Sequence, residues 1–453
     1  MSLRSFVQEM EKQGEVLHVA EKVSPRFEIS AIIKAFDKNG PVLFFENVGD
    51  YRTRVVANVC GTRDRLCKAL GIARAGLYRR LVDAWRMPTR PKIVEGGPVN
   101  EVVEEPRLSK IPVLTHFEKD AGAYITSAII SARSLDKKVE NVSIHRLQVL
   151  DDKHLSIRLV PRQLYELWRT AKKARQNLEV AISVGLHPAV SIASTALVPF
   201  GVSEYEVANT LLEGNFSLVK CEHLDVYAPA EAEYVLEGVM SAEKEVLEGP
   251  LVDITGTYDV QRSQPVIELV GVMRREDAVY QGLLPSGSEH KLLMGLPREV
   301  KIWEAVGNIV PKVKAVNLTS GGCGWLHAVV SIEKHKDGDA KNALMATFSA
   351  HPSVKHAVVV DADVDVYNSA EVEWAIATRF QASEDLIIIP HVRGSTLDPS
   401  ADQESGETTK MGVDATRPID RKREKFEPAK IPANMRVKKI IDGLFSAFGE
   451  VKP

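Results

Sequence analysis

The dense succession of short apolar segments between residues 111 and 311 restricts the fold of this chain more than any other feature. Five of these segments are rich in apolar and β-branched residues, as strands are: YITSAIISARS, VSIHRLQVL, HLSIRLV, EVAISVGL and PVIELVGVMRR. Only two helical patterns, over 164–173 and 203–212, interrupt them. Parallel neighbours need a crossover connection, usually a helix, for each pair of strands. The segment therefore predicts an antiparallel sheet or barrel rather than a doubly wound domain.

The segments on either side have mixed α/β patterns. Apolar residues recur at helical spacing over 3–10 and 29–33, and PVLFFENV and TRVVANV are typical of strands. After residue 312, strand-like and helix-like stretches alternate as far as LIIIP. We therefore divide the chain into domains at 1–110, 111–311 and 312–453.

The end of the chain has two features of its own. Residues 394–432 are polar and rich in Pro, Gly and Asp, without any periodicity, which predicts a long arm without regular structure. MRVKKIIDGLFSAF then has the spacing of an amphipathic helix. Its apolar face must pack either on the body of the protein or on a second subunit.

Charge and composition exclude several classes of partner. The 58 Lys and Arg residues nearly balance 61 Asp and Glu, and a net charge of -3 gives no long-range attraction for nucleic acid or an anionic membrane. The sequence contains no run of 18 apolar residues, so it predicts no membrane-spanning helix. Its first segment, MSLRSFVQEMEKQGE, has no signal-peptide pattern. The four cysteines form no CxxC pair. We expect a cytoplasmic protein that holds any bound anion in a local site.

The common motifs for phosphate, calcium and nucleophilic serine are missing or incomplete. GGCG at 321–324 lacks the Lys and Ser/Thr of a P-loop. The acidic residues from Asp361 onward have calcium-loop spacing, but Val366 replaces the required Gly and Val372 the required Glu. No GxSxG elbow is present. The sequence therefore gives no support to a calcium loop or a serine hydrolase.

Three short segments contain an unusual set of polar groups. NVSIHR has Asn141 and Arg146, FGVSEY has Glu204 at the start of a predicted helix, and LEGPLVD has Glu248 and Asp253. Side chains five apart in a regular strand point to opposite faces, but the Gly-Pro pair between the two acids permits a bend that lets them converge. From the residues alone, a turn with two solvated acids and a surface arginine remain open alternatives.

Several segments together resemble the UbiD-like family of prenylated-FMN-dependent decarboxylases, in particular its furan and heteroaromatic acid members. They are NVSIHRLQVLDDKHL, FGVSEY, LEGPLVDITGTY, TKMGVDAT and LRSFVQEMEKQGEV, which occur in family order over nearly the whole chain. The resemblance implies an α+β fold in which a split β-barrel, related to flavin reductases, is flanked by N-terminal and C-terminal α/β domains. It also implies a homodimer or a hexamer of dimers, joined through the C-terminal domain.

The resemblance implies a cofactor, prenylated FMN, that a separate flavin prenyltransferase supplies. The residues implied to bind it are Asn141, Ser143, Ile144, His145, Arg146, Gln163, Glu204 and Lys410. Asn141, Gln163 and Glu204 match the family's ligands for Mn2+, or here Mg2+, with K+ nearby. Gln163 departs from the family pattern, which commonly has His, and makes the site all-oxygen. Lys410 is implied near the flavin phosphate, with a solvated lysine as the alternative.

Arg146, Glu248 and Asp253 match the family's catalytic Arg-acid-acid network. The resemblance implies reversible, non-oxidative removal of CO2 from an aromatic, heteroaromatic or α,β-unsaturated carboxylic acid, with the flavin taking up the electrons. Asp253, where many members have Glu, would protonate the carbon that loses CO2, and we expect burial to raise its pKa. Arg146 would keep Glu248 ionised and help to position the substrate carboxylate.

The substrate class is suggested by LLPSGSEHKLLMGLPRE, which lies where the family lines its substrate pocket. His290 and Arg298 in this segment are expected to bind a second polar or anionic group, as in a furan-type acid or diacid. The alternative is a helix start with a surface arginine. Two other functions also remain: an ordinary FMN-dependent oxidoreductase, which needs no Arg-acid-acid network, and a non-catalytic flavin-binding protein.

Overall fold

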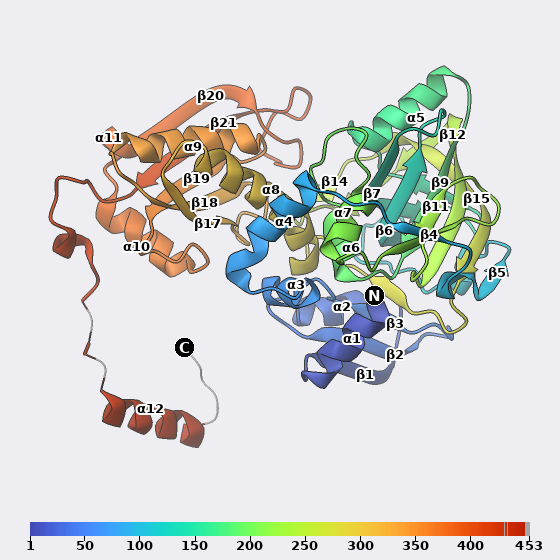
Figure 1. Cartoon of the computed structure of the whole chain (residues 1–453), viewed down its shortest axis with the longest axis horizontal. Helices are drawn as coiled ribbons and strands as arrows, with labels where there is room; N and C mark the ends of the chain where they lie inside the picture. The colour runs from blue at the N-terminus through green and yellow to red at the C-terminus, as the bar shows by residue number, and fades with distance from the viewer. Residues whose placement is uncertain (430, 433, 449–453) are drawn as a thin grey trace.

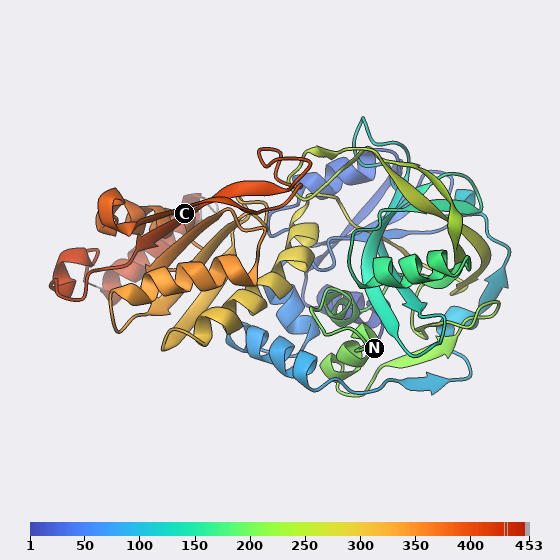
Figure 2. The ribbon, with the colours of Figure 1, turned by 90° about the horizontal axis from the view of Figure 1, so that it is seen from above.

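The strands of the middle segment close into a six-stranded antiparallel barrel, in the order β12-β9-β6-β7-β8-β15 with β15 paired back to β12 (Figure 2). The computed structural model of the chain describes residues 1–429, 431–432 and 434–448. The barrel strands are β6 (Tyr124–Arg133), β7 (Glu140–Val149), β8 (His154–Ile157), β9 (Leu178–Val184), β12 (Tyr234–Glu248) and β15 (Arg262–Arg274). The predicted antiparallel barrel is therefore confirmed.

The barrel strands are apolar on both faces because each face packs against a different core. β6 is buried along nearly its whole length. Ile130 packs with Ile182 and Leu236 in one apolar cluster, whereas its neighbour Ile129 belongs to another that contains residues of the N-terminal helices. This double burial explains why the sequence shows nearly continuous apolar runs instead of a strict alternation.

The N-terminal segment forms a small sheet of order β1-β2-β3-β16. Its elements are α1 (Leu3–Lys12), β1 (Val16–Val23), α2 (Glu28–Ala35), β2 (Val42–Val48) and β3 (Val55–Ala57), close to the predicted positions, with β16 (Tyr280–Gly282) added from the middle segment. In the other direction, β4 (Lys92–Val94) pairs with β10 (Ser217–Lys220), and β5 (Val102–Glu104) pairs with β15. The expected boundary after residue 110 is therefore crossed by strand pairing both ways.

The remaining elements of this half are helices, short strands and 3-10 turns. They are α3 (Arg63–Ala69), α4 (Leu77–Arg86), α5 (Gln163–Lys173), α6 (Pro188–Ala193), α7 (Glu204–Leu211), β11 (Tyr227–Pro229), β13 (Leu251–Val252), β14 (Tyr258–Asp259), α8 (Ser288–Gly307) and the short 3-10 turns at Arg74–Gly76, Pro98–Asn100 and Leu108–Lys110. The two predicted helices of the middle segment are α5 and α7. The long helix α8 leads from the barrel to the C-terminal domain (Figure 1).

The C-terminal domain is a five-stranded sheet of order β17-β18-β19-β21-β20. Its elements are β17 (Lys312–Leu318), β18 (His327–Glu333), α9 (Gly338–Ala350), β19 (His356–Asp361), α10 (Ser369–Arg379), α11 (Ala382–Asp385), β20 (Leu386–Arg393) and β21 (Glu407–Ala415), with a 3-10 turn at Arg423–Phe426. The prediction of an arm without structure was wrong for β21, which lies inside the sheet between β19 and β20. Its buried positions include Lys410, Gly412 and Asp414, so it has no apolar pattern to detect.

The predicted final helix is α12 (Met435–Phe448), which stands apart from the three domains (Figure 1). Its apolar side chains are exposed, namely Val437, Ile440, Ile441, Leu444 and Phe445. Within one chain, the described residues therefore do not cover the apolar face of this helix. No helix in the described part of the chain is both long enough and apolar enough to span a membrane.

Candidate active site

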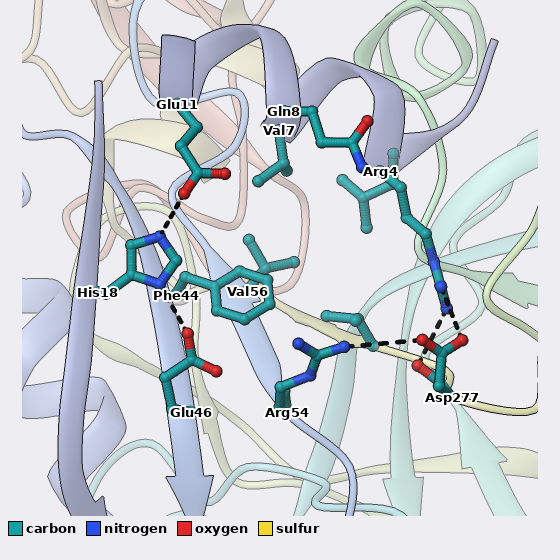
Figure 3. Close-up of a pocket in the computed structure, with 12 residues that line it drawn as sticks. Arg4, Val7, Gln8, Glu11, His18, Phe44, Glu46, Arg54, Val56 and Asp277 are labelled. Carbon is teal, nitrogen blue, oxygen red and sulfur yellow. Dashed lines mark hydrogen bonds and ion pairs between the residues drawn. The ribbon is translucent and has the colours of Figure 1, made fainter. Parts of the chain in front are cut away.

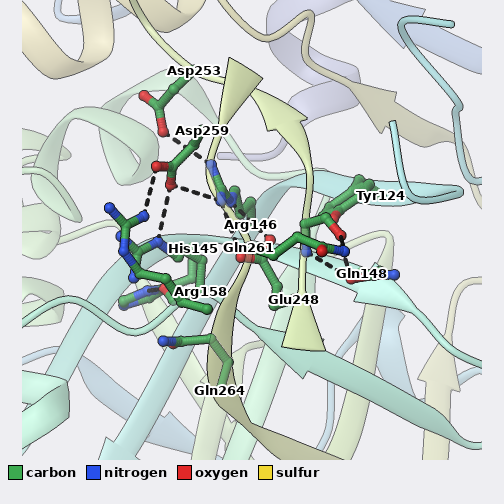
Figure 4. A network of polar contacts seen from close by, with 12 residues as sticks. Tyr124, His145, Arg146, Gln148, Arg158, Glu248, Asp253, Asp259, Gln261 and Gln264 are labelled. Carbon is green, nitrogen blue, oxygen red and sulfur yellow. Dashed lines mark hydrogen bonds and ion pairs between the residues drawn. The ribbon is translucent and has the colours of Figure 1, made fainter. Parts of the chain in front are cut away.

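Arg146, on β7, brings together the two acids that the sequence singles out (Figure 4). Its Nε and Nη2 donate to the two carboxylate oxygens of Glu248 at 2.9 and 3.0 Å, and its Nη1 donates to Oδ2 of Asp253 at 3.0 Å. The Glu248 side chain is fully buried and that of Arg146 is 11% exposed. A turn with two solvated acids is therefore excluded, and so is a surface arginine.

The bend between Glu248 and Asp253 is what makes this convergence possible. Glu248 is the last residue of β12, and Gly249 then adopts a φ of +97°, a conformation that side chains with a Cβ rarely adopt. Asp253 lies in the turn that connects β13 to β14, where its backbone N–H donates to the carbonyl of Thr257 at 3.0 Å. Its side chain is 20% exposed, so it is less buried than the sequence analysis expects.

A third carboxylate, Asp259 on β14, completes the network and was missed by the sequence analysis. Its Oδ2 accepts from Nη2 of Arg146 at 3.0 Å and from Nε of Arg158 at 3.3 Å. Its Oδ1 accepts from Nη1 of Arg262 at 2.6 Å. Burial alone would raise the pKa of Asp259, but these three arginines outweigh it and leave that pKa below its usual value. The feature that could have revealed Asp259 is the hairpin itself, because β14 returns alongside β13 and pairs Asp259 with Leu251.

His290, near the start of α8, lies close to this network. The charges of Asp253 and Arg146 both act on it, although burial is the main reason that its pKa is below its ordinary value. Its Nδ1 accepts from the backbone N–H of Ser286 at 3.0 Å, so the proton of the neutral ring is on Nε2. His290 therefore lies near the Arg146 network, and its binding of a second group of the substrate stays a prediction.

The three residues predicted to bind a metal also meet. Nδ2 of Asn141 is 3.0 Å from Oε1 of Glu204 and 3.5 Å from Oε1 of Gln163. Glu204 is the first residue of α7, whose N-cap is Ser203, and its Oε2 accepts from the backbone N–H of Val142 at 2.6 Å. Gln163 is the first residue of α5. Two helix N-termini and the start of β7 therefore form this group of oxygens.

Asn141, Gln163 and Glu204 fit a hard divalent cation. Glu204 is 4% exposed, and burial raises its pKa to about 8, because no basic side chain of the described residues pairs with it. A cation would compensate that buried charge, and amide and carboxylate oxygens are the ligands that Mn2+ and Mg2+ accept. Asn141 would have to turn its amide, since its Oδ1 now accepts from Ser143. No cluster of three or more His, Cys, Asp or Glu residues suited to a metal exists among the described residues.

The other residues implied to bind the flavin alternate along β7. Ser143 and His145 follow Asn141 on one side, whereas Ile144 points to the opposite side with Arg146. Oγ of Ser143 lies 2.9 Å from Nε2 of His145. Burial lowers the pKa of His145 to about 4, which keeps its ring neutral.

The two remaining predicted residues, Lys410 and Arg298, are on β21 of the C-terminal sheet and on α8, respectively. Lys410 is on β21 and 4% exposed, so the alternative of a solvated lysine is wrong. Its Nζ donates to the carbonyls of Pro352 and Val354, and none of its hydrogen bonds reaches the Asn141 group. The guanidinium of Arg298 lies 5.5 Å from the centre of the Trp325 ring. The alternative of a surface arginine is also wrong, because Arg298 is half-buried.

A separate cavity of about 290 Å3 lies in the N-terminal domain (Figure 3). Its polar side chains are largely paired with one another: His18 contacts Glu11 and Glu46, and Arg4 contacts Asp277. None of the residues that line it belongs to the Arg146 network or to the Asn141 group. The polar network at the barrel is therefore the candidate active site.

Profiles of one enzyme family cover most of the chain. The N-terminal domain of 3-octaprenyl-4-hydroxybenzoate carboxy-lyase matches residues 7–85, its Rift-related domain matches 92–288, and its C-terminal domain matches 291–415. Among curated relatives, the anhydromevalonate phosphate decarboxylases of Methanothermobacter thermautotrophicus and Methanosarcina mazei are 43% and 42% identical. Those alignments cover 94% and 95% of this chain, and 99% and 100% of the relatives.

Solved structures agree over the whole molecule. The UbiD-class enzyme HmfF from Pelotomaculum thermopropionicum, in complex with FMN, has a TM-score of 0.94 and 40% identity, over 98% of this chain and 100% of HmfF. The 3,4-dihydroxybenzoic acid decarboxylase AroY from Klebsiella pneumoniae has a TM-score of 0.90 and 25% identity, over 98% and 99% of the two chains. These matches confirm the predicted α+β fold and the predicted family. The chain belongs to the UbiD family of carboxy-lyases.

Proposed function

We propose that this chain uses prenylated FMN for the reversible, non-oxidative decarboxylation of a small unsaturated carboxylic acid. The observation that carries the proposal is the buried contact of Arg146 with Glu248 and Asp253, together with the oxygen group of Asn141, which is on the same strand. A solved form of HmfF contains prenylated FMN, which supports the same cofactor here. An ordinary FMN oxidoreductase would have no use for two acids held by one arginine.

Each member of the network has a distinct role in this proposal. When bound, prenylated FMN supplies an electron-poor ring that takes up the electrons released as CO2 leaves. Glu248 is fully buried with both oxygens on Arg146, so it fixes the orientation of the guanidinium. Asp253 is the more exposed acid and has a single contact with Arg146, so it is the group that can reach the substrate and protonate its carbon.

Asn141, Gln163 and Glu204 would hold Mn2+ or Mg2+, and through it the flavin phosphate, with K+ as a second cation. Burial raises the pKa of Glu204, and a cation at this point would favour its ionised form, which supports the metal assignment. Gln163 would contribute its amide oxygen, while its Nε2 keeps the bond to the carbonyl of Val198 at 2.9 Å. The site would therefore select hard metals over those that prefer imidazole.

Two substrate classes are candidates. The curated relatives named above act on anhydromevalonate phosphate, by its name an unsaturated acid that also carries a phosphate. Their identity over nearly the whole chain favours a substrate of this kind. A furan-type acid or diacid, which His290 and Arg298 suggest, is the second candidate. Substrates of both classes have a conjugated carboxylate, and in both classes a second anionic group can be present.

The exposed apolar face of α12 supports a homodimer, or a hexamer of dimers, joined through the C-terminal region. Ile440, Leu444 and Phe445 are between 43% and 55% exposed in the single chain. Apolar residues repeated along one helix face are usually covered in a stable assembly. A second copy of this chain would cover them.

The proposed function is tested by expressing the chain with and without a flavin prenyltransferase. CO2 release is then measured with anhydromevalonate phosphate and with furan, pyrrole, hydroxybenzoic and cinnamic acids. We expect turnover only after coexpression, and the best acid identifies the substrate class. Plain FMN in the protein and no CO2 from any acid, after coexpression, would contradict the proposal and favour an oxidoreductase or a non-catalytic protein.

A further inference from the structure

Four aromatic and basic side chains form a continuous cluster between α8 and the C-terminal sheet. The guanidinium of Arg298 lies over the Trp325 ring, and that ring meets His351 edge-on with centroids 4.4 Å apart. Lys410 lies next to His351, since its Nζ binds the carbonyls of Pro352 and Val354. Arg298 and Lys410, which the sequence analysis assigned to two different ligands, therefore belong to one cluster.

Two buried polar atoms of this cluster have no partner among the described residues. They are Nε1 of Trp325 and Nε2 of His351. Trp325 is 4% exposed and His351 is 1% exposed. A buried polar atom without a hydrogen bond costs roughly 1–3 kcal/mol, so these two adjoining rings can each offer a hydrogen bond to a ligand.

The cluster also carries positive charge without a counter-ion. Arg298 forms no ion pair with a carboxylate of the described residues, and neither does Arg162, an exposed residue at the edge of the cluster whose charge acts on both Arg298 and His351. Burial and then the charge of Arg162 lower the pKa of Arg298 to about 10. The pKa of His351 is lowered to about 3, first by burial and then by the charges of Arg298, Lys410 and Arg162. Like charges gathered in a partly desolvated place are unfavourable unless an anion joins them.

We propose that Arg298, Trp325 and His351 of this cluster, together with the neighbouring exposed Arg162, bind the dianionic phosphate of a phosphomonoester, whereas Lys410 keeps its bonds to two backbone carbonyls. A phosphate offers three oxygens and close to two negative charges, which suits two guanidiniums and the indole N–H. A carboxylate has one charge and two oxygens, and would leave one guanidinium unpaired. This inference rests on the proposed function, because it specifies the group that the same site recognises.

The phosphate has two possible sources, which the position of the cluster connects. Arg162 directly precedes Gln163, which we assign to the flavin-phosphate metal. Arg298 lies two turns along α8 from His290, which is close to Asp253. The phosphate is therefore that of the flavin or that of a phosphorylated substrate.

Equilibrium binding to the purified full chain distinguishes these sources without turnover. The variants are Arg298→Gln and Arg162→Gln, with Arg169→Gln, an exposed residue on α5 that pairs with Glu166, as the matched control. One arm measures FMN and riboflavin binding with Mn2+ present, by flavin fluorescence. The other arm uses protein loaded with plain FMN and measures, by calorimetry, binding of anhydromevalonate phosphate and of its dephosphorylated acid.

Loss of one guanidinium should weaken the phosphate-bearing ligand by about tenfold or more. If FMN weakens and riboflavin does not, the cluster holds the flavin phosphate. If the phosphorylated acid weakens and the dephosphorylated acid does not, it holds the substrate phosphate. In the wild-type chain, millimolar inorganic phosphate should compete with the same ligand, which tests the site even where a variant fails to fold.

Unchanged affinities in both arginine variants, with no competition by inorganic phosphate, would overturn the inference. That result is distinct from failure of the proposed function. A chain that decarboxylates an acid but binds every phosphate equally well in all variants keeps its proposed function and loses this site. A chain without decarboxylase activity whose FMN affinity depends on Arg298 loses the function and keeps the site.

Discussion

Nη2 of Arg146 donates to Oδ2 of Asp259 at 3.0 Å, so the arginine that holds the two predicted acids also holds a third. Nη2 is shared between Asp259 and Glu248, whereas the contact with Asp253 is made by Nη1. The network as a whole pairs three arginines with three carboxylates: Arg146, Arg158 and Arg262 with Glu248, Asp253 and Asp259. Removing one of these charges must therefore change the field at the other five.

Asp259→Asn should lower turnover at neutral pH and move the alkaline limb of the pH–rate profile to lower pH. Without the charge of Asp259, the positive charges of Arg146, Arg158 and Arg262 are less compensated, so the site holds the proton that it must supply less tightly. The active form of the enzyme is then lost at lower pH. We expect a displacement of about one pH unit, measured from CO2 release between pH 5 and 9.

Asp361→Asn is the matched control for this displacement. Asp361 is 7% exposed and also accepts from two arginines, Arg379 and Arg417, but it lies in the C-terminal sheet. Its loss should lower the melting temperature and leave the pH–rate profile in place. Equal profiles for the wild type and Asp259→Asn would show that Asp259 has only a structural role.

Asp253→Asn should abolish turnover while the flavin stays bound. The amide can still contact Arg146 but cannot supply the proton, and loss of a general acid typically costs about 10²- to 10⁴-fold. Flavin content is read from the visible spectrum and turnover from CO2 release. Asp151→Asn, at a 60% exposed side chain, is the control. Turnover at the wild-type rate would remove Asp253 from the role of proton donor.

Glu204→Ala should release metal and flavin together. Glu204 supplies the only carboxylate among the three proposed ligands, and its loss removes the charge that holds the cation. We expect FMN affinity to fall by at least about tenfold, with Mn2+ content falling in parallel by elemental analysis. Glu206→Ala, two residues along α7 and paired with Arg90, should retain both. Full retention of metal and flavin by Glu204→Ala would refute the metal assignment.

The sequence predicts the parts of this molecule that depend on local patterns. The many strand-like segments between residues 111 and 311 were sufficient to predict the antiparallel barrel, because antiparallel strands need only short connections. The Gly-Pro pair after Glu248 permitted a bend, and the structure has one there. The roles of Arg146 and Asn141 came from the family resemblance, since their spacing alone is common to surface residues.

The parts that the sequence does not predict depend on contacts between distant segments. Asp259 becomes a partner of Arg146 only when β14 returns alongside β13. β21 is an inner strand although Lys410 is on it, because two backbone carbonyls satisfy the ammonium. The contacts of Trp325 with Arg298 and His351 join α8 to the segment before β18 and to the end of α9. No local sequence pattern encodes these contacts, because they form only when distant segments pack together.

The buried carboxyl of Glu289 at the start of α8 should make stability fall as pH rises. It is 3% exposed, its Oε1 accepts from the backbone N–H of Cys60 at 2.7 Å, and its Oε2 has no partner among the described residues. Burial raises its pKa from 4.5 to about 7. Below pH 4.5 the carboxyl is protonated in both the folded and the unfolded state, so its burial does not reduce the free energy of unfolding through ionisation. As pH rises from 4.5 to 7, the unfolded chain ionises first, and the folded state loses stability.

Glu289→Gln should therefore reduce the loss of unfolding free energy between pH 5 and pH 8, by up to about 3 kcal/mol, because one pKa unit corresponds to about 1.4 kcal/mol. Urea unfolding at the two pH values measures this difference. Glu268→Gln, at an exposed position on β15, should leave the difference as it is in the wild type. If Glu289→Gln has the same pH dependence as the wild type, Glu289 is ionised in the folded protein, and an unseen cation or water must compensate its charge.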